Sequence, residues 1–216
     1  MPVETLVVGQ LSTNCYLFYD EDSRQCFIID PGDDGDYIIR KIKDLDLKPQ
    51  AILATHGHFD HVLAAAELKL AFDIPFYLNA KDAKILKRTQ STAKYFTSLE
   101  VDPVLMPDKF LSDGQELKIE NCKLKILFTP GHTPGSVTFL YADRHTKKYQ
   151  VQAKCQAFVG DLIFAHGGYG RTDLRGGDMN KLQQSIKKIL AFPSETILYS
   201  GHGDLTSVKK EKKFYG

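Results

Sequence analysis

Cysteine is scarce in this sequence, and the few cysteines are far apart. The chain has four, Cys15, Cys26, Cys122 and Cys155, and no C-x-x-C pair. This spacing indicates neither a zinc knuckle nor a thioredoxin-like redox motif. Widely separated thiols are more typical of buried cysteines in a reducing compartment than of a disulfide framework.

An excess of charge of either sign is also missing. The chain has 28 basic and 27 acidic residues, which gives a formal net charge of +1. Such a balance supplies no field that would gather nucleic acid or an anionic membrane. No apolar run approaches the length of a membrane span, and the first residues lack the basic and apolar regions of a secretory signal. We therefore predict a cytoplasmic protein with a small-molecule substrate and neither a nucleic-acid nor a membrane partner, while the oligomeric state is unknown.

The composition that remains is that of an ordinary globular protein. Hydrophobic residues make up 43% of the chain and charged residues 25%, as in most soluble domains. A chain of 216 residues can bury a sizeable core without disulfides or structural metals. Any metal site is therefore expected to serve function rather than to hold the fold together.

The hydrophobic pattern predicts strands interleaved with helices. We expect a final helix that begins after Asp178 as its N-cap. Both halves of the chain show strands followed by helix and strand, which predicts one α/β domain over residues 1–216, made of two similar αβ halves with helices outside the sheets. The predicted strands cover residues 14–20, 25–30, 51–55, 76–78, 116–119, 122–128, 136–141, 156–160 and 195–200, and the predicted helices cover 36–47, 62–72, 81–92 and 180–191.

One short stretch, THGHFDH, concentrates ligand-type side chains directly after a predicted strand. His56 and His58 are two residues apart, so an extended turn lets both lean toward one point. Asp60 and His61 follow and can face a second point. Because a zinc ion takes about four ligands, the stretch offers too many for one open site and too few for two. Four such side chains at this spacing rarely arise for packing reasons.

Three further residues repeat the design of an apolar strand followed by a polar side chain. They are His132 in TPGHTPGS, Asp161 in FVGDLIF and His202 in YSGHGD. A single histidine at a strand end is more often structural than metal-binding, yet together these residues supply what the first stretch lacks. His145 and His166 do not follow this pattern.

These segments, together with GRTDL, resemble the metallo-β-lactamase fold superfamily and, within it, the short glyoxalase II-like hydrolases, also described as hydroxyacylglutathione hydrolase-like. The resemblance implies a four-layer αβ/βα sandwich with a metal site along one edge. It also implies two divalent metal ions, with zinc expected first and iron or manganese as alternatives. By the same resemblance, His56, His58 and His132 hold the first metal, Asp60, His61 and His202 hold the second, and Asp161 bridges them.

Such a site predicts a metal-dependent hydrolase. Two cations lower the pKa of a shared water toward ~7, and the resulting bridging hydroxide is the expected nucleophile. Asp60 is the expected catalytic residue, which orients this hydroxide or relays its proton. A thiolate leaving group, with a pKa near ~8.5, departs without a strong general acid. This favours a thioester as substrate, in agreement with the resemblance.

The stretch GYGRTDLRGGD provides candidate substrate contacts, because its glycines permit tight turns near a site. Tyr169, Arg171 and Asp173 are the residues we expect to touch substrate. The alternative is a surface loop held by an ion pair between Arg171 and Asp173. Full-length glyoxalase II enzymes carry a helical region whose basic residues hold glutathione. Here the residues from Val208 onward read as a short basic tail, which we expect to be solvated.

Three other functions remain open on the sequence. A mononuclear iron persulfide dioxygenase would, by resemblance, hold iron with His56, His132 and Asp161 alone. A hydrolase of another ester or of a phosphodiester is the second, although the near-neutral charge disfavours nucleic acid as substrate. The third is a non-catalytic metal-binding or partner-binding protein that keeps the site for stability.

Overall fold

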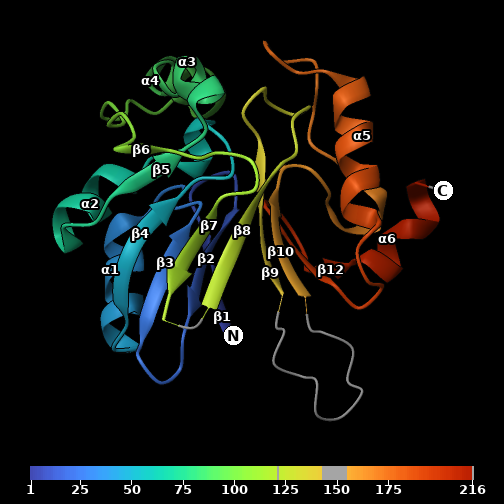
Figure 1. Cartoon of the computed structure of the whole chain (residues 1–216). Helices are drawn as coiled ribbons and strands as arrows, with labels where there is room; N and C mark the ends of the chain where they lie inside the picture. Colours follow the sequence, from blue (N-terminus) through green and yellow to red (C-terminus); the bar gives the residue numbers. More distant parts are fainter. Residues whose placement is uncertain (121, 143–154, 216) are drawn as a thin grey trace. The chain divides into compact units, whose positions relative to one another are not determined.

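The computed structural model describes residues 1–120, 122–142 and 155–215, and the chain forms two compact units. Unit 1 comprises Met1–Leu111 and Ile119–Asn121, and unit 2 comprises Ser112–Lys118 and Cys122–Gly216. The chain contains two six-stranded sheets (Figure 1). The prediction of a single domain with two similar halves stays a prediction.

The sheet of unit 1 has the order β1-β2-β3-β4-β5-β6. Its first three strands pair antiparallel, and β3 to β6 pair parallel. The carboxyl ends of the parallel strands therefore meet at one edge of the sheet. The elements of unit 1 are β1 (Val3–Val8), β2 (Thr13–Tyr19), β3 (Gln25–Ile29), α1 (Gly35–Asp44), β4 (Lys48–Leu53), the 3-10 turn η1 (Phe59–His61), α2 (Ala65–Phe72), β5 (Phe76–Leu78), the 3-10 turn η2 (Ala80–Asp82), α3 (Ala83–Leu86), α4 (Thr89–Thr97) and β6 (Lys109–Phe110).

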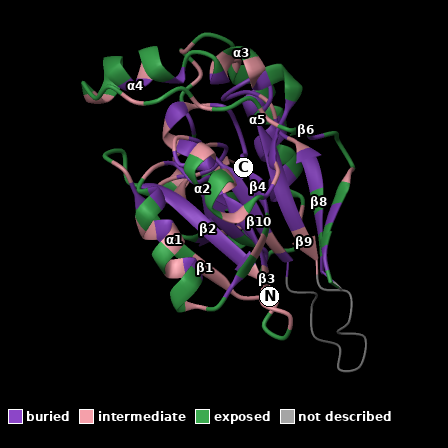
Figure 2. Ribbon diagram, turned by 90° about the vertical axis from the view of Figure 1, so that its left-hand side faces the viewer, coloured by how far each residue is buried: buried purple, intermediate pink, exposed green. Residues whose placement is uncertain are grey.

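Burial of apolar side chains explains how the helices of unit 1 attach to the sheet. In α1, Ile38 and Ile42 are fully buried and lie one turn apart on one face of the helix. Leu68 of α2 joins the same core, which also takes in Leu17 of β2 and Ile52 of β4. Figure 2 shows the buried strands of this unit beside the exposed outer faces of α1 and α2.

The second sheet has the order β12-β11-β10-β9-β8-β7. In this sheet β10 and β11 pair parallel, whereas β8 with β9, β9 with β10 and β11 with β12 pair antiparallel. The core of unit 2 combines this sheet with Leu182, Ile186 and Ile189 of α5 and with Val208 of α6. The elements are β7 (Glu116–Ile119), β8 (Cys122–Phe128), β9 (Val137–Ala142), β10 (Cys155–Gly160), the 3-10 turn η3 (Ala165–Gly167), α5 (Met179–Leu190), β11 (Ile197–Ser200), β12 (Thr206–Ser207) and α6 (Val208–Tyr215).

The predicted strands and three of the four predicted helices are confirmed within one to three residues at their ends. Asp178 is the N-cap of α5, and its carboxylate accepts a hydrogen bond from the Lys181 backbone N–H. The predicted helix over residues 81–92 is wrong, because Arg88 leaves helical geometry with φ −108° and ψ 4° between α3 and α4.

Two elements were not predicted. The first is β1, whose strand pairs with β2 over six residues. The second is α6, which replaces the solvated tail that we expected. Val208 and Glu211 of α6 are buried, so this segment is part of the packed structure of unit 2. Among the described residues, no helix combines the length and the apolar character needed to cross a membrane.

Candidate metal centre

The first half-site consists of His56, His58, Asp60 and His61 in unit 1. The segment begins just after β4 ends at Leu53 and runs through η1, so it joins a strand end to a helix start, as predicted. Within the turn, the His61 backbone N–H donates to the His58 carbonyl at 3.1 Å. This short-range bond brings the end of the segment back toward its beginning.

His56 and His58 direct one ring nitrogen each toward a common point. The Nε2 of His56 lies 3.1 Å from the Nδ1 of His58. The other nitrogen of His56, Nδ1, lies 3.1 Å from the Thr55 hydroxyl oxygen, and that hydroxyl donates to Asp30 at 2.7 Å. Since the Thr55 hydrogen goes to Asp30, His56 donates from Nδ1 and keeps the Nε2 lone pair for a cation.

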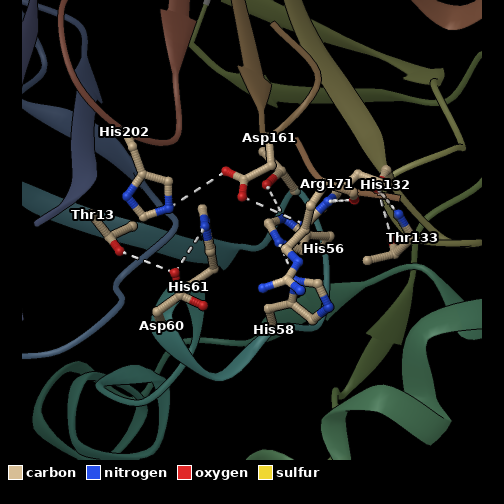
Figure 3. A network of polar contacts seen from close by, with 12 residues as sticks. Thr13, His56, His58, Asp60, His61, His132, Thr133, Asp161, Arg171 and His202 are labelled. Atoms are coloured by element: carbon tan, nitrogen blue, oxygen red, sulfur yellow. Dashed lines mark hydrogen bonds and ion pairs between the residues drawn. The ribbon is translucent and has the colours of Figure 1, made fainter. Parts of the chain in front are cut away.

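Asp60 and His61 form the second pair of this half-site (Figure 3). The Nε2 of His61 lies 3.6 Å from Asp60 Oδ2, which also receives the Thr13 hydroxyl at 3.4 Å. The Nδ1 of His61 lies 3.1 Å from Asp30 Oδ2. A carboxylate on one ring nitrogen fixes the tautomer and leaves the other nitrogen basic, which is the usual support of a metal-binding histidine.

Asp30 is a supporting residue that sequence reasoning missed. It follows β3 at the same edge where the segment after β4 begins, and its backbone N–H donates to the Leu53 carbonyl. Its side chain is 1% exposed and serves Thr55 through both oxygens besides His61. The available signal was an acidic residue directly after the apolar run CFII, which is the pattern already used for Asp161.

The second half-site consists of His132, Asp161 and His202 in unit 2. They follow β8, β10 and β11 respectively, so each sits beyond the end of a strand of one sheet. The Nε2 of His132 lies 3.5 Å from Asp161 Oδ2, and the Nε2 of His202 lies 3.7 Å from Asp161 Oδ1 (Figure 3). Asp161 therefore directs one oxygen toward each histidine, which is the geometry that a bridging carboxylate needs.

A backbone segment from Gly168 to Arg171 supports this half-site. The Arg171 carbonyl oxygen lies 2.7 Å from His132 Nδ1, so His132 donates from Nδ1 and keeps the Nε2 lone pair for a cation. The Gly170 N–H donates to the Asp161 carbonyl at 3.0 Å. A Cβ on Gly170 would lie 2.0 Å from that carbonyl oxygen and 2.9 Å from His132 Nδ1. Glycine is required here by close approach to both ligands.

A protein-family model, that of the metallo-beta-lactamase superfamily, matches residues 8–147. The chain belongs to this superfamily.

Relatives and solved structures agree with this assignment. The chain is 37% identical to the hydroxyacylglutathione hydrolase GloC of Haemophilus influenzae, over 99% of this chain and 96% of the relative. It is similar to the solved BLEG-1 B3 metallo-beta-lactamase, with a TM-score of 0.86, 35% identity and 100% of both chains covered. It is also similar to TTHA1623, solved in a di-iron-bound form, with a TM-score of 0.83, 34% identity and 98% of both chains covered. The predicted metallo-β-lactamase fold is confirmed.

The ligand chemistry of both half-sites fits the metals of this superfamily. Neutral imidazole nitrogens and carboxylate oxygens suit zinc, iron and manganese. Each histidine whose second ring nitrogen is fixed by a partner, namely His56, His61 and His132, keeps Nε2 for a cation. His145, which was set aside on the sequence, lies outside the described residues.

The loop residues expected to touch substrate form a local ion pair. Arg171 donates to both oxygens of Asp173 at 2.8 and 2.6 Å. This pairing holds the pKa of Asp173 down to about 2. Tyr169 is 46% exposed. The ion pair that the alternative reading required is therefore present, and contact of these three residues with substrate stays a prediction.

Proposed function

We propose that the two half-sites together hold two divalent cations and that the protein hydrolyses thioesters. His56, His58 and His132 would hold one cation and Asp60, His61 and His202 the other, with Asp161 shared. The observation that carries this proposal is the position of Asp161, whose two oxygens lie 3.5 and 3.7 Å from the Nε2 atoms of two different histidines. The first half-site divides into two pairs in the same way.

Similarity over the whole chain supports the joining of the half-sites. The match to BLEG-1 covers all of this chain, and therefore both units. Neither half-site alone offers enough ligands for two ions at about four ligands each. Together they do, once water and substrate take the remaining positions.

In the reaction, the residues of the chain would bind the cations, orient the attacking water and accept its proton. Two bound cations would supply a water nucleophile of lowered pKa and would polarise the substrate carbonyl. Asp60 receives the Thr13 hydroxyl on Oδ2, which fixes the plane of its carboxylate. It would orient the attacking water and accept its proton. Because a thiolate leaves without protonation, the leaving group makes no demand for a further acid.

Thioester turnover with and without a chelator tests the proposal. The substrates are a hydroxyacyl-glutathione thioester, an acyl thioester that lacks glutathione, and a β-lactam, which is included because of the similarity to BLEG-1. We expect turnover of at least one thioester that chelator abolishes and zinc restores. Lack of any chelator-sensitive thioester turnover contradicts the proposal, and turnover of the β-lactam alone replaces it with amide hydrolysis.

A measurement of metal content distinguishes the proposed two-cation hydrolase from a mononuclear iron persulfide dioxygenase. Two ions per chain agree with the proposed site. One iron per chain together with oxygen uptake would instead identify the persulfide dioxygenase, with three of the seven residues as ligands. Lys94→Gln is a suitable control for both assays, since its side chain is exposed and paired with Glu100 rather than with a half-site residue.

A further inference from the structure

The C-terminal helix α6 carries a buried carboxylate that has no part in the proposed chemistry. Glu211 is only 1% exposed. It accepts hydrogen bonds from the Gly167 N–H at 2.8 Å, the His166 N–H at 3.3 Å and the Thr206 hydroxyl at 2.5 Å. Burial of a carboxylate is costly unless its oxygens are satisfied in this way, so this contact is expected to be specific.

The segment that Glu211 holds has an uncommon backbone conformation. His166 has φ 65° and ψ 31°, and Gly167 has φ 80°. Left-handed geometry at a non-glycine residue is unfavourable and persists only where surrounding contacts impose it. Successive left-handed residues turn their N–H groups to one side, and such a concavity binds an anion. Here the anion is the Glu211 side chain.

A second residue of α6, Tyr215, holds the loop at Gly168, the residue that follows Gly167. The Tyr215 hydroxyl donates to the Gly168 carbonyl at 2.7 Å, and the Phe164 N–H donates to the same oxygen at 2.7 Å. Phe214 packs so closely that a Cβ on Gly167 would lie 2.8 Å from its ring. The helix therefore fixes Gly167 and Gly168 through polar and apolar contacts.

From Gly168 the chain leads directly to the second half-site. Gly170 donates to the Asp161 carbonyl at 3.0 Å, and the Arg171 carbonyl lies 2.7 Å from His132 Nδ1. Only two residues, Tyr169 and Gly170, separate Gly168, which α6 holds, from Arg171, whose carbonyl orients His132. All of these contacts lie within unit 2.

We infer that Glu211 is a positioning residue for the metal ligands His132 and Asp161. From α6 it fixes the turn at residues 166–167, and the loop then presents the Arg171 carbonyl to His132 and the Gly170 N–H to Asp161. Tyr215 supports the same loop at Gly168. The inference rests on the proposed function only in taking His132 and Asp161 as ligands. It does not depend on the substrate.

The Glu211→Gln variant keeps the shape of the side chain but replaces one of its two acceptor oxygens with a donor group. A glutamine has one acceptor oxygen and one NH2 group. Whichever way it is turned, its NH2 faces at least one of the His166 and Gly167 N–H groups, and that donor loses its partner. We expect the loop to shift and the support of His132 to weaken.

The experiment measures cobalt(II) binding to metal-free protein by chelator competition, together with the visible absorption of the bound cobalt. Loss of an outer partner of a metal ligand typically lowers affinity 10–100-fold, so Glu211→Gln should lower the affinity of at least one site by about 10-fold or more. The cobalt spectrum, which reports ligand geometry, should change. Tyr215→Phe should give a smaller change in the same direction.

Two controls separate positioning from general loss of stability. Leu190→Ala truncates a buried side chain of α5, and Lys212→Gln changes an exposed residue of α6. Leu190→Ala should lower Tm without altering the cobalt spectrum, and Lys212→Gln should change neither. If Glu211→Gln does not fold, Tyr215→Phe decides the question alone.

Unchanged affinity and spectrum in the variants, or an equal loss in Leu190→Ala, would overturn the inference. In either case wild-type protein that binds two cobalt ions leaves the proposed function standing. Wild-type protein that binds none overturns both.

Discussion

The two half-sites of this protein are built in different ways. The first takes all its ligands from one segment, His56 to His61, which folds back on itself through a bond between His61 and His58. The second takes its ligands from the ends of three strands. Its first and last ligands, His132 and His202, are 70 residues apart in the sequence. Local sequence therefore defines the geometry of the first half-site, whereas tertiary contacts define that of the second.

The supporting residues follow the same division. In the first half-site, Asp30 serves His61 directly and His56 through Thr55. The second half-site depends on a chain of contacts that runs from α6 through Gly168 and Gly170 to the ligands. A change far from the metal should therefore affect the second half-site more readily than the first.

Asp161→Asn is expected to have the largest effect, because it removes a carboxylate whose two oxygens each face a different histidine. Loss of an outer partner costs 10–100-fold in metal affinity, so loss of this ligand should cost more than about 100-fold and abolish thioester turnover. Metal analysis after dialysis measures this. Retention of two tightly bound ions would show that Asp161 is not shared.

Asp30→Asn tests the first half-site through the support that Asp30 gives to His61 and, by way of Thr55, to His56. The asparagine amide has only one acceptor oxygen, so it cannot accept hydrogen bonds from Thr55 and His61 at both positions. His61 and His56 are therefore expected to lose their orientation. We expect metal affinity to fall about 10–100-fold, measured by chelator competition. An unchanged affinity would mean that the local turn alone suffices to orient these histidines.

Gly170→Ala tests the backbone support of the second half-site. The added Cβ would meet the Asp161 carbonyl at 2.0 Å, so the loop must move away from both ligands. Overpacking of this kind costs typically 1–3 kcal/mol of stability, measured by urea unfolding, and we expect metal affinity to fall about 10-fold as well.

Gly114→Ala is the matched control for that change. Gly114 also lies in unit 2 and has φ 76°, but a Cβ there would meet nothing within 4 Å. It should lose stability through backbone strain while keeping its metal affinity. Equal losses of affinity in both glycine variants would argue against a specific role for Gly170.

Asp173→Asn should have the smallest effect. The pKa of Asp173 is lowered to about 2 by its hydrogen bond with Arg171. Because the pKa is lower in the folded protein, the ionised carboxylate adds to the free energy of unfolding at pH values above its unfolded pKa of about 3.9. This contribution is lost as the pH falls through the folded pKa of about 2. Because the carboxylate is charged in both states between pH 5 and 8, Tm should show no dependence on this group there. An exposed pair contributes little, so Tm and metal content should match wild type, and a raised KM would identify a substrate contact.

The difference between the half-sites also explains what the sequence could predict. The stretch THGHFDH is recognisable because its ligands are neighbours, and the strand ends before His132, Asp161 and His202 are visible as apolar runs. The supports of the second half-site are not visible, because a backbone carbonyl such as that of Arg171 leaves no trace in residue type. Asp30 could have been found by the same rule as Asp161.

The helix α6 shows most clearly how a pattern can be hidden. Its buried positions are Val208, Glu211 and the half-buried Tyr215, which share one face at helical spacing. Because the middle position is a glutamate among four lysines, the segment reads as a charged tail. The backbone donors of His166 and Gly167, together with the Thr206 hydroxyl, make a carboxylate suitable at this buried position.

The most direct test of the account is thioester turnover measured while metal-free protein is titrated with zinc. The account predicts background turnover at the start, a rise with added zinc and a plateau at two equivalents per chain. A plateau at one equivalent, or no turnover at any ratio, would contradict the claim that the two half-sites form one two-cation site.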